Sequence, residues 1–150
     1  MGGDAVCSYC GCRNIPMIAK LTAEHEDVAA CAYQLTAAHR DDDVDAARAA
    51  ALELAGKLHP HTRREENGVF AELKKDDLFT EHIEELCAEH DELDRHIDAI
   101  VAGDISMVPN LVLLLKSHID REENGLFPSA LAYLTDDQWE TIHSPTLMQD

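Results

Sequence analysis

Two ten-residue stretches of the chain are nearly identical, and they constrain the fold more than any other feature. Residues 61–70 read HTRREENGVF, and residues 118–127 read HIDREENGLF. Each contains a histidine followed four residues later by a glutamate, which gives the pairs His61–Glu65 and His118–Glu122. Residues four apart lie on one face of a helix. Each pair can therefore direct an imidazole nitrogen and a carboxylate oxygen toward the same point.

A shorter repeat precedes each of these stretches. The sequence Ala-Glu-His occurs at residues 23–25 and again at residues 88–90. Two helical hairpins packed about a pseudo-twofold axis would bring the repeated side chains together: His25, His61, Glu65, His90, His118 and Glu122. Imidazole and carboxylate groups suit iron, manganese or zinc, and facing helices of bundles commonly build such sites. The repeat therefore predicts a two-metal site, whereas a single H-x-x-x-E pair would be weak support for one.

Apolar residues recur every three or four positions along most of the chain, which predicts helices, and no segment has the pattern of a strand. We expect four long helices: Met17 to about His39, about Asp43 through the first H-x-x-x-E pair, about Asp77 to Ala102, and about Ser106 to Asn124-Gly125. Pro60 should either kink the second helix or begin a fresh helical turn. A short final helix is expected after Thr135, since Thr135 and Gln138 have capping-box spacing. The predicted fold class is all-α, an antiparallel up-down-up-down four-helix bundle.

We expect three parts in the chain: a Cys-rich leader over residues 1–16, the bundle over 17–134, and a short helix and tail over 135–150. The leader holds the closely spaced thiols of Cys7, Cys10 and Cys12. They could bind zinc or copper, form a reversible disulfide, ligate a cluster, or have no role. Two further cysteines, Cys31 and Cys87, lie on expected helices and are predicted to be small buried hydrophobic residues.

The charge balance limits the partners of the chain. Its 150 residues include 30 Asp and Glu but 12 Lys and Arg, for a net charge of −18. Nucleic-acid binding requires clustered basic side chains, so no nucleic-acid partner is expected. No secretory signal and no apolar run approaching about 18 residues is visible, so we expect a cytoplasmic protein without a membrane partner. The oligomeric state is left open, with a monomer as one option.

The two repeated elements, in this order, resemble the bacterial hemerythrin-like (HHE cation-binding) domains over about residues 17–134. The resemblance implies a four-helix bundle that holds two non-heme iron ions, bridged by carboxylates and an oxo or hydroxo species. It also implies the individual ligands. The histidine ligands would be His25, His61, His90 and His118, and the bridging carboxylates would be Glu65 and Glu122.

The expected third helix departs from the pattern of oxygen-carrying hemerythrins, which have two histidines there in an H-x-x-x-H arrangement. Here Leu86 lies four residues before His90, and Asp94 lies four residues after it. His82 is about 12 Å from His90 along a helix, too far to share a metal ion. The chain is therefore similar to hemerythrin-like domains associated with iron–sulfur repair, nitric oxide or iron sensing, and simple oxygen carriage is not expected.

Several other residues are candidates for lesser roles. We expect Glu66 and Glu123 either to contact the metal-binding side chains from outside the site or to face solvent. The alternative is that they bridge the metal ions in place of Glu65 and Glu122. Asp94 could orient His90 or supply an oxygen ligand, and Tyr33 could reach the metals but is expected in a core or an interface. Glu24 and Glu89 could modulate proton delivery, and Phe70 and Phe127 should close the core below the site. The remaining histidines are expected to be surface or packing residues: His39, His59, His82, His96 and His143.

The function implied is binding of, or reaction with, O2, H2O2 or NO at two iron ions, in oxidative or nitrosative stress response or redox sensing. One alternative is an iron-handling or sensor module without turnover. Another is an enzyme that disproportionates peroxide, and a purely structural bundle is the third. The sequence leaves open whether the protein is an enzyme, which of the small molecules is its physiological ligand, and which metal is bound.

Overall fold

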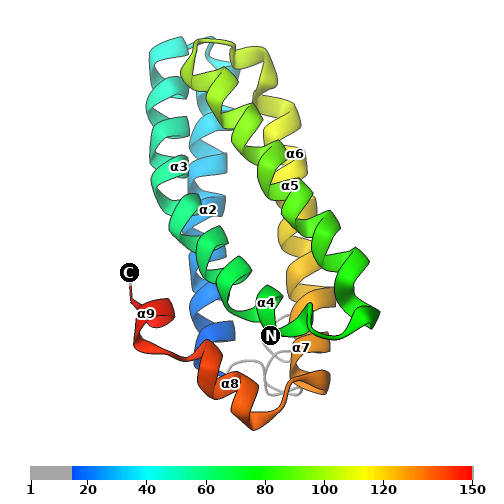
Figure 1. Ribbon diagram of the computed structural model, residues 1–150. Helices are drawn as coiled ribbons and strands as arrows, with labels where there is room; N and C mark the ends of the chain where they lie inside the picture. Colours follow the sequence, from blue (N-terminus) through cyan, green and yellow to red (C-terminus); the bar gives the residue numbers. More distant parts are fainter. Residues whose placement is uncertain (1–14, 150) are drawn as a thin grey trace.

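The computed structural model describes residues 15–149, and within that range all regular structure is helical (Figure 1). The long helices are α2 (Pro16–Arg40), α3 (Val44–Asn67), α5 (Asp77–Val101) and α6 (Val108–Arg121). The short ones are α4 (Val69–Leu73), η2 (Ile105–Met107), η3 (Glu122–Leu126), α7 (Phe127–Tyr133), α8 (Asp136–Ile142) and α9 (Pro145–Met148). The prediction of an all-α helical bundle is confirmed.

The four long helices pack in a ring. Helix α2 contacts α3 and α6, and α5 contacts the same two helices. Figure 1 shows the chain running up α2, down α3, up α5 and down α6, while α8 and α9 lie at the end where α2 begins. Each long helix therefore turns one face toward the interior of the ring.

Two apolar clusters fill this interior at different heights. One lies toward the start of α2 and includes Met17, Leu21, Phe70, Leu86 and Phe127. The other lies beyond it and includes Leu35, Leu54, Ile97, Leu111 and Leu115. Each long helix has one buried histidine that falls in sequence between residues of the two clusters: His25, His61, His90 and His118. The histidines thus form a polar layer between two apolar layers.

Local sequence accounts for several helix boundaries. The side chain of Asp43 accepts a hydrogen bond of 3.0 Å from the backbone N–H of Ala46 and caps α3. Thr135 and Gln138 form the capping box that opens α8, so the predicted short helix after Thr135 is confirmed. Helix α3 continues through Pro60, so of the two alternatives for that residue, a kink or a fresh helical turn, the fresh turn is excluded. Proline removes one hydrogen-bond donor, and the tertiary packing of α3 against α2 and α5 outweighs that loss.

The two REENG sequences adopt different backbones. In the first, α3 ends at Asn67, and a Cβ added to Gly68 would lie 2.8 Å from the Arg64 carbonyl oxygen, so any other residue would force a local shift. In the second, residues Glu122–Leu126 form a π-helical turn that continues into α7. The prediction that the fourth helix ends at Asn124-Gly125 is therefore wrong. Pro128 has no N–H to donate, which interrupts α-helical bonding there, and the wider π turn keeps the chain helical.

The three thiols of the Cys-rich leader, Cys7, Cys10 and Cys12, lie outside the residues that the structure describes. Of the two helical cysteines, Cys31 is buried and Cys87 is half-buried. Burial raises the pKa of each thiol. Over residues 15–149 no helix combines the length and apolar character needed to cross a membrane.

Candidate metal centre

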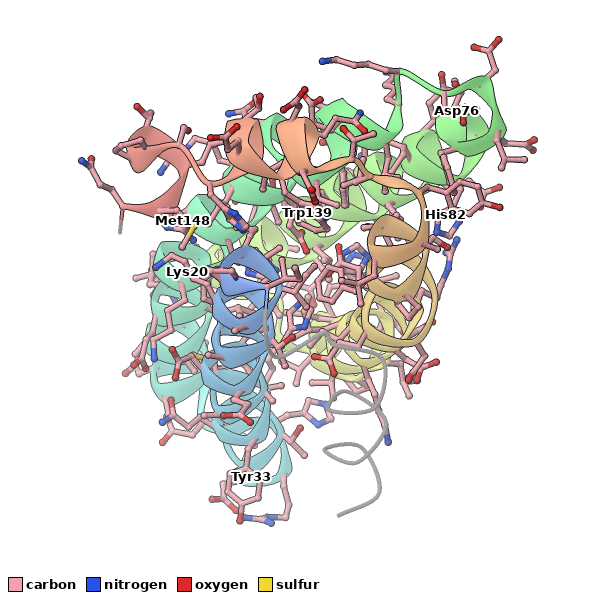
Figure 2. All side chains as sticks on the ribbon, turned by 90° about the horizontal axis from the view of Figure 1, so that it is seen from below. Lys20, Tyr33, Asp76, His82, Trp139 and Met148 are labelled. Atoms are coloured by element: carbon pink, nitrogen blue, oxygen red, sulfur yellow. The ribbon has the colours of Figure 1, made fainter. Side chains whose placement is uncertain are left out.

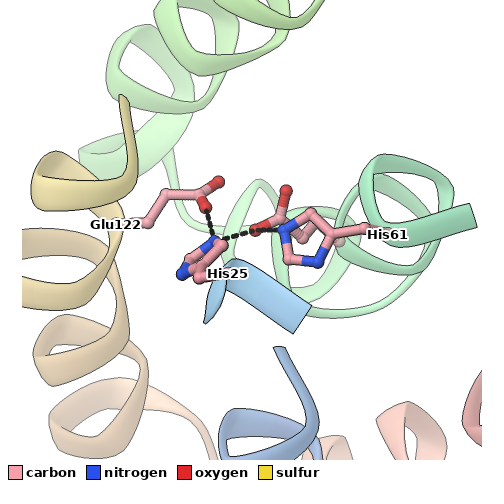
Figure 3. Close-up of side chains that lie close together, drawn as sticks. His25, His61 and Glu122 are labelled. Atoms are coloured by element: carbon pink, nitrogen blue, oxygen red, sulfur yellow. Dashed lines mark hydrogen bonds and ion pairs between the residues drawn. The ribbon is translucent and has the colours of Figure 1, made fainter. Parts of the chain in front are cut away.

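Six buried side chains meet in the polar layer between the two apolar clusters. Their ligand atoms form two groups, each within 4.8 Å: His25, His61, Glu65 and Glu122, and Glu65, His90, His118 and Glu122. Figure 3 shows His25, His61 and Glu122 turning toward one another from α2, α3 and η3. The structure therefore brings together all six residues that the repeat singled out, and both glutamates belong to both groups.

The first group surrounds a point between α2, α3 and η3. His25 Nε2 lies 2.9 Å from Glu122 Oε1 and 4.0 Å from Glu65 Oε2. His61 Nε2 lies 3.2 Å from the same Glu65 Oε2. One oxygen from each carboxylate thus faces the two imidazoles of this group.

The second group repeats the arrangement on the other side of the two carboxylates. His90 Nε2 lies 3.2 Å from Glu65 Oε1, and His118 Nε2 lies 3.1 Å from Glu122 Oε2. The two imidazole nitrogens are themselves 3.1 Å apart. Each carboxylate therefore presents one oxygen to each ligand group. A carboxylate that bridges two cations must do the same.

An outer carboxylate contacts the Nδ1 atom of each of these four histidines. Each Nδ1–H donates to one glutamate: His25 to Glu123 at 2.6 Å, His61 to Glu24 at 2.9 Å, His90 to Glu66 at 2.6 Å and His118 to Glu89 at 2.7 Å. A neutral ring that binds a metal ion through Nε2 carries its proton on Nδ1, where the outer carboxylate accepts it. The Nε2 lone pair of each histidine is then directed into the centre.

Without a positive charge this centre would be strongly repulsive. Lone pairs of Nε2 atoms would face carboxylate oxygens, and four buried atoms have no hydrogen-bond partner: His61 Nε2, both oxygens of Glu65 and Glu122 Oε2. Buried polar groups without partners are costly. Either protons on Nε2 or cations between the ligand atoms must offset that cost.

The pKa values show how strongly the centre attracts positive charge. For His25, burial lowers the pKa, but hydrogen bonds to Glu122 and Glu123 outweigh burial and raise the pKa to about 9. The same balance, dominated by Glu65 for His61 and by Glu122 and Glu65 for His90, raises their pKa values to about 10 and about 11. Burial opposes ionisation of Glu122, yet the nearby imidazole groups of His118, His25 and His90 hold its pKa well below the ordinary value.

The donor set fits a pair of transition-metal ions. Bonds of about 2.1 Å at right angles place neighbouring ligand atoms about 3.0 Å apart. The closest contacts in the centre, between 2.9 Å and 3.2 Å, match that spacing. Two imidazole nitrogens and two carboxylate oxygens would face each ion, a set that suits iron, manganese or zinc.

Two arginines hold the outer carboxylates, although the pattern of metal-ligand residues in the sequence does not mark them. Arg64 donates to Glu24 through Nη1, and Arg121 donates to Glu89 through Nη1. Both arginines occupy the fourth position of the repeated H-x-x-R-E-E sequence, three residues after a histidine. The repeat itself was the signal that could have found them, together with their Glu24 and Glu89 partners.

Two phenylalanines close the centre toward the start of α2. Phe127 stacks on His25 with ring centroids 5.9 Å apart, and Phe70 stacks on His90 at 5.6 Å. Both rings are 1% exposed. Their predicted place below the site agrees with this geometry, and each ring covers a histidine from the other half of the repeat.

The remaining candidates lie away from the centre. Asp94 Oδ1 is 3.1 Å from His59 Nε2 at the surface, so it neither orients His90 nor contributes to the ligand groups. Tyr33 is 78% exposed and points outward in Figure 2, so it neither reaches the centre nor belongs to the core, and of the expected places only an interface is left. Leu86 is fully buried in the apolar cluster near the start of α2. His82, labelled in Figure 2, belongs to neither ligand group.

The other histidines serve packing or lie at the surface, as expected. His96 is buried, and its Nδ1 lies 2.7 Å from the backbone carbonyl of Glu92. His143 Nε2 accepts a hydrogen bond from the Met17 backbone N–H, and its ring stacks on Trp139. Burial lowers the pKa of His143.

A groove between α2 and α6 reaches the edge of the centre. Its volume is about 470 Å³, and His25 and Glu123 form part of its wall. The rest of the wall is mainly apolar and includes Ala29, Val112 and Leu115. The groove therefore offers a route from the surface to the His25–Glu123 pair.

Comparison with known proteins is consistent with this geometry. A family model described as the hemerythrin HHE cation binding domain matches residues 16–130. Neither a curated protein nor a solved structure matches the chain. The matched residues contain the whole of both ligand groups.

Proposed function

The chain belongs to the hemerythrin HHE cation-binding domain family, and from that premise we propose that it binds two iron ions and reacts there with O2, peroxide or NO. The family binds metal cations, typically iron, and the His and Glu groups could hold such ions. We propose His25, His61, His90 and His118 as the terminal ligands and Glu65 and Glu122 as the bridges. The bundle, over residues 17–134, would be an antiparallel up-down-up-down four-helix bundle.

The two shared carboxylates carry this proposal. Glu65 and Glu122 are fully buried, and three of their four oxygens have no hydrogen-bond partner. Each carboxylate spans the two histidine groups. A buried pair of carboxylates in this position is costly unless positive charge, from protonated imidazoles or from metal cations, lies on both sides.

When bound, iron would supply the electrons and the free coordination position that a small oxidant requires. The two carboxylates would hold the ions together and neutralise their charge. The four outer glutamates would fix the imidazole planes through Nδ1. Phe70 and Phe127, with the apolar clusters on either side, would exclude bulk water from the centre.

The apolar groove between α2 and α6 favours a small uncharged ligand. O2 and NO can enter an apolar groove at little desolvation cost, uncharged H2O2 enters at a higher cost because it gives up hydrogen bonds to water, and anions pay the highest cost. The groove wall includes His25 and Glu123, so a molecule that fills it would stand next to the first ligand group. This observation supports binding of small molecules rather than purely structural metal.

The test is to load the protein with Fe²⁺ under anaerobic conditions and then add O2, H2O2 or NO separately. We expect new visible absorption bands with at least one of the three. Steady consumption of peroxide would support an enzyme, and a spectral change that does not turn over would support a sensor or iron-handling module. Iron-loaded protein whose spectrum none of the three molecules changes would contradict the proposed reactivity.

A further inference from the structure

The two halves of the repeat differ in how their arginines are held. Arg64 is 4% exposed, whereas the equivalent Arg121 has a side chain that is 35% exposed. Both donate to the outer glutamate of their own half through Nη1. The difference lies in the other donors of each guanidinium group.

The remaining donors of Arg64 bind the end of the chain. Its Nε donates to the Leu147 carbonyl at 2.8 Å, and its Nη2 donates to the Gln149 carbonyl at 2.6 Å. We call residues 144–149, which contain α9, the C-terminal strap. The strap packs on α3, and a Leu147 methyl group lies next to Gly68. The guanidinium fork is thereby fixed on three sides, by one carboxylate and two carbonyls.

The remaining donors of Arg121 have no comparable restraint. Its Nη2 donates to Glu85 at 3.1 Å, and the Glu85 side chain is 55% exposed. Water competes with hydrogen bonds at such a site, while the buried bonds of Arg64 are stronger because the surroundings are less polar. The guanidinium group of Arg121 is therefore less restrained than that of Arg64, although the two outer carboxylates are similarly exposed, Glu89 at 18% and Glu24 at 22%.

We propose that the C-terminal strap holds Arg64 against Glu24 and so orients His61, which makes the His25–His61 metal position tighter than the His90–His118 position. Arg64 is a positioning residue in this arrangement, since it acts through Glu24 and not on the metal itself. The inference rests on the proposed two-metal centre. It adds an asymmetry that the repeated sequence alone does not contain.

The test follows the release of Co²⁺ from the loaded protein after a chelator is added. Wild-type protein should release its two ions in two phases. Arg64→Lys keeps the charge but loses the fork, and Leu147→Asn weakens the packing of the strap without touching the centre. Both should accelerate the slower phase by about 10- to 100-fold, the usual effect of losing a group that supports a metal ligand. Arg121→Lys, the matched control, should accelerate the faster phase instead.

A second measurement separates orientation from general loss of stability. In the metal-free protein, the Nδ1–H proton of His61 should exchange with water faster in Leu147→Asn than in wild type, by nuclear magnetic resonance. The Nδ1–H proton of His118 should be unchanged. Equal acceleration of both release phases, or no change in either phase, would overturn the proposal. Wild-type protein that binds no Co²⁺ would instead overturn the metal centre, and the proton exchange would still test the strap.

Discussion

Each histidine of the centre uses both ring nitrogens, and this determines what the site can bind. Nδ1 donates to an outer glutamate, so Nε2 is the nitrogen that faces the interior and that can bind a metal ion once it has lost any proton. A neutral buried histidine has one N–H group that donates and one ring nitrogen whose lone pair accepts. Four of them with fixed lone pairs, around two buried carboxylates, require positive charge between them.

The loss of metal that follows removal of a ligand should depend on whether that ligand belongs to one ligand group or to both. His118→Ala removes a donor from one group, so we expect loss of about one of two ions. Glu65→Ala removes an oxygen from both groups, and we expect both affinities to fall by more than about 100-fold. Metal analysis after gel filtration measures both effects.

His59→Ala is the matched control for these variants, because His59 lies on the same helix as His61 with its side chain 57% exposed. It should retain the full metal content. Similar metal loss in His59→Ala and His118→Ala would show that the ligand assignment is wrong.

The raised histidine pKa values predict how the metal-free protein responds to pH. The pKa values of His25, His61 and His90 rise from 6.5 to about 9, 10 and 11, so the folded state holds protons that the unfolded chain has released. These protons stabilise the folded metal-free protein in full at a pH below the histidine pKa of the unfolded chain. The stabilisation is lost as the pH rises through the higher histidine pKa values of the folded protein. Urea unfolding of the metal-free protein should therefore give a lower midpoint at about pH 10 than at about pH 7.

The same protons compete with metal. Binding of Zn²⁺ should release protons and should become tighter as the pH rises from about 6 to about 8. Titration calorimetry in buffers with different ionisation enthalpies measures the protons released. Zinc binding that releases no protons would contradict the assignment of Nε2 as the metal-facing atom.

At the scale of helices, the two REENG sequences show how one sequence can serve two backbones. The first ends α3 and places Gly68 against the Arg64 carbonyl, while the second forms a π turn beginning at Glu122. Both nevertheless place a glutamate in the centre, one turn after a histidine. The two halves of the repeat thus place the carboxylate equivalently, although the backbone that follows it differs between them.

The glycines in these sequences should respond differently to alanine. In Gly68→Ala the new Cβ would lie 2.8 Å from a backbone oxygen, so something must shift, and we expect a loss of about 1–3 kcal/mol. Gly125→Ala meets no atom within 4 Å and should be neutral or stabilising by up to about 1 kcal/mol. Equal unfolding midpoints for the two variants in urea would contradict this difference.

Helical period and capping residues were enough to predict α2, α3, α5 and the start of α8 to within a few residues. The continuation of the chain past Gly125 was not predictable in the same way, because Asn-Gly is a stop signal in one half and part of a π turn in the other. The six central residues were found because the repeat marks them twice. The contacts of Arg64 with the strap depend on backbone carbonyls far along the chain, and no local pattern reports such contacts.

At the scale of the whole molecule, the centre is a polar layer held between two apolar clusters by four helices in a ring. Each half of the repeat supplies two histidines and one shared carboxylate, so neither half can build either ligand group alone. The strap and its arginine then distinguish the two halves. The proposed chemistry therefore depends on the packing of the complete bundle.

The most direct test is an anomalous difference map, recorded at the iron absorption edge, from crystals of the iron-loaded protein. We predict two peaks on either side of the Glu65 and Glu122 carboxylates. One peak should lie against His25 and His61, and the other against His90 and His118. A single peak, or peaks away from these side chains in fully loaded protein, would contradict the two-metal centre.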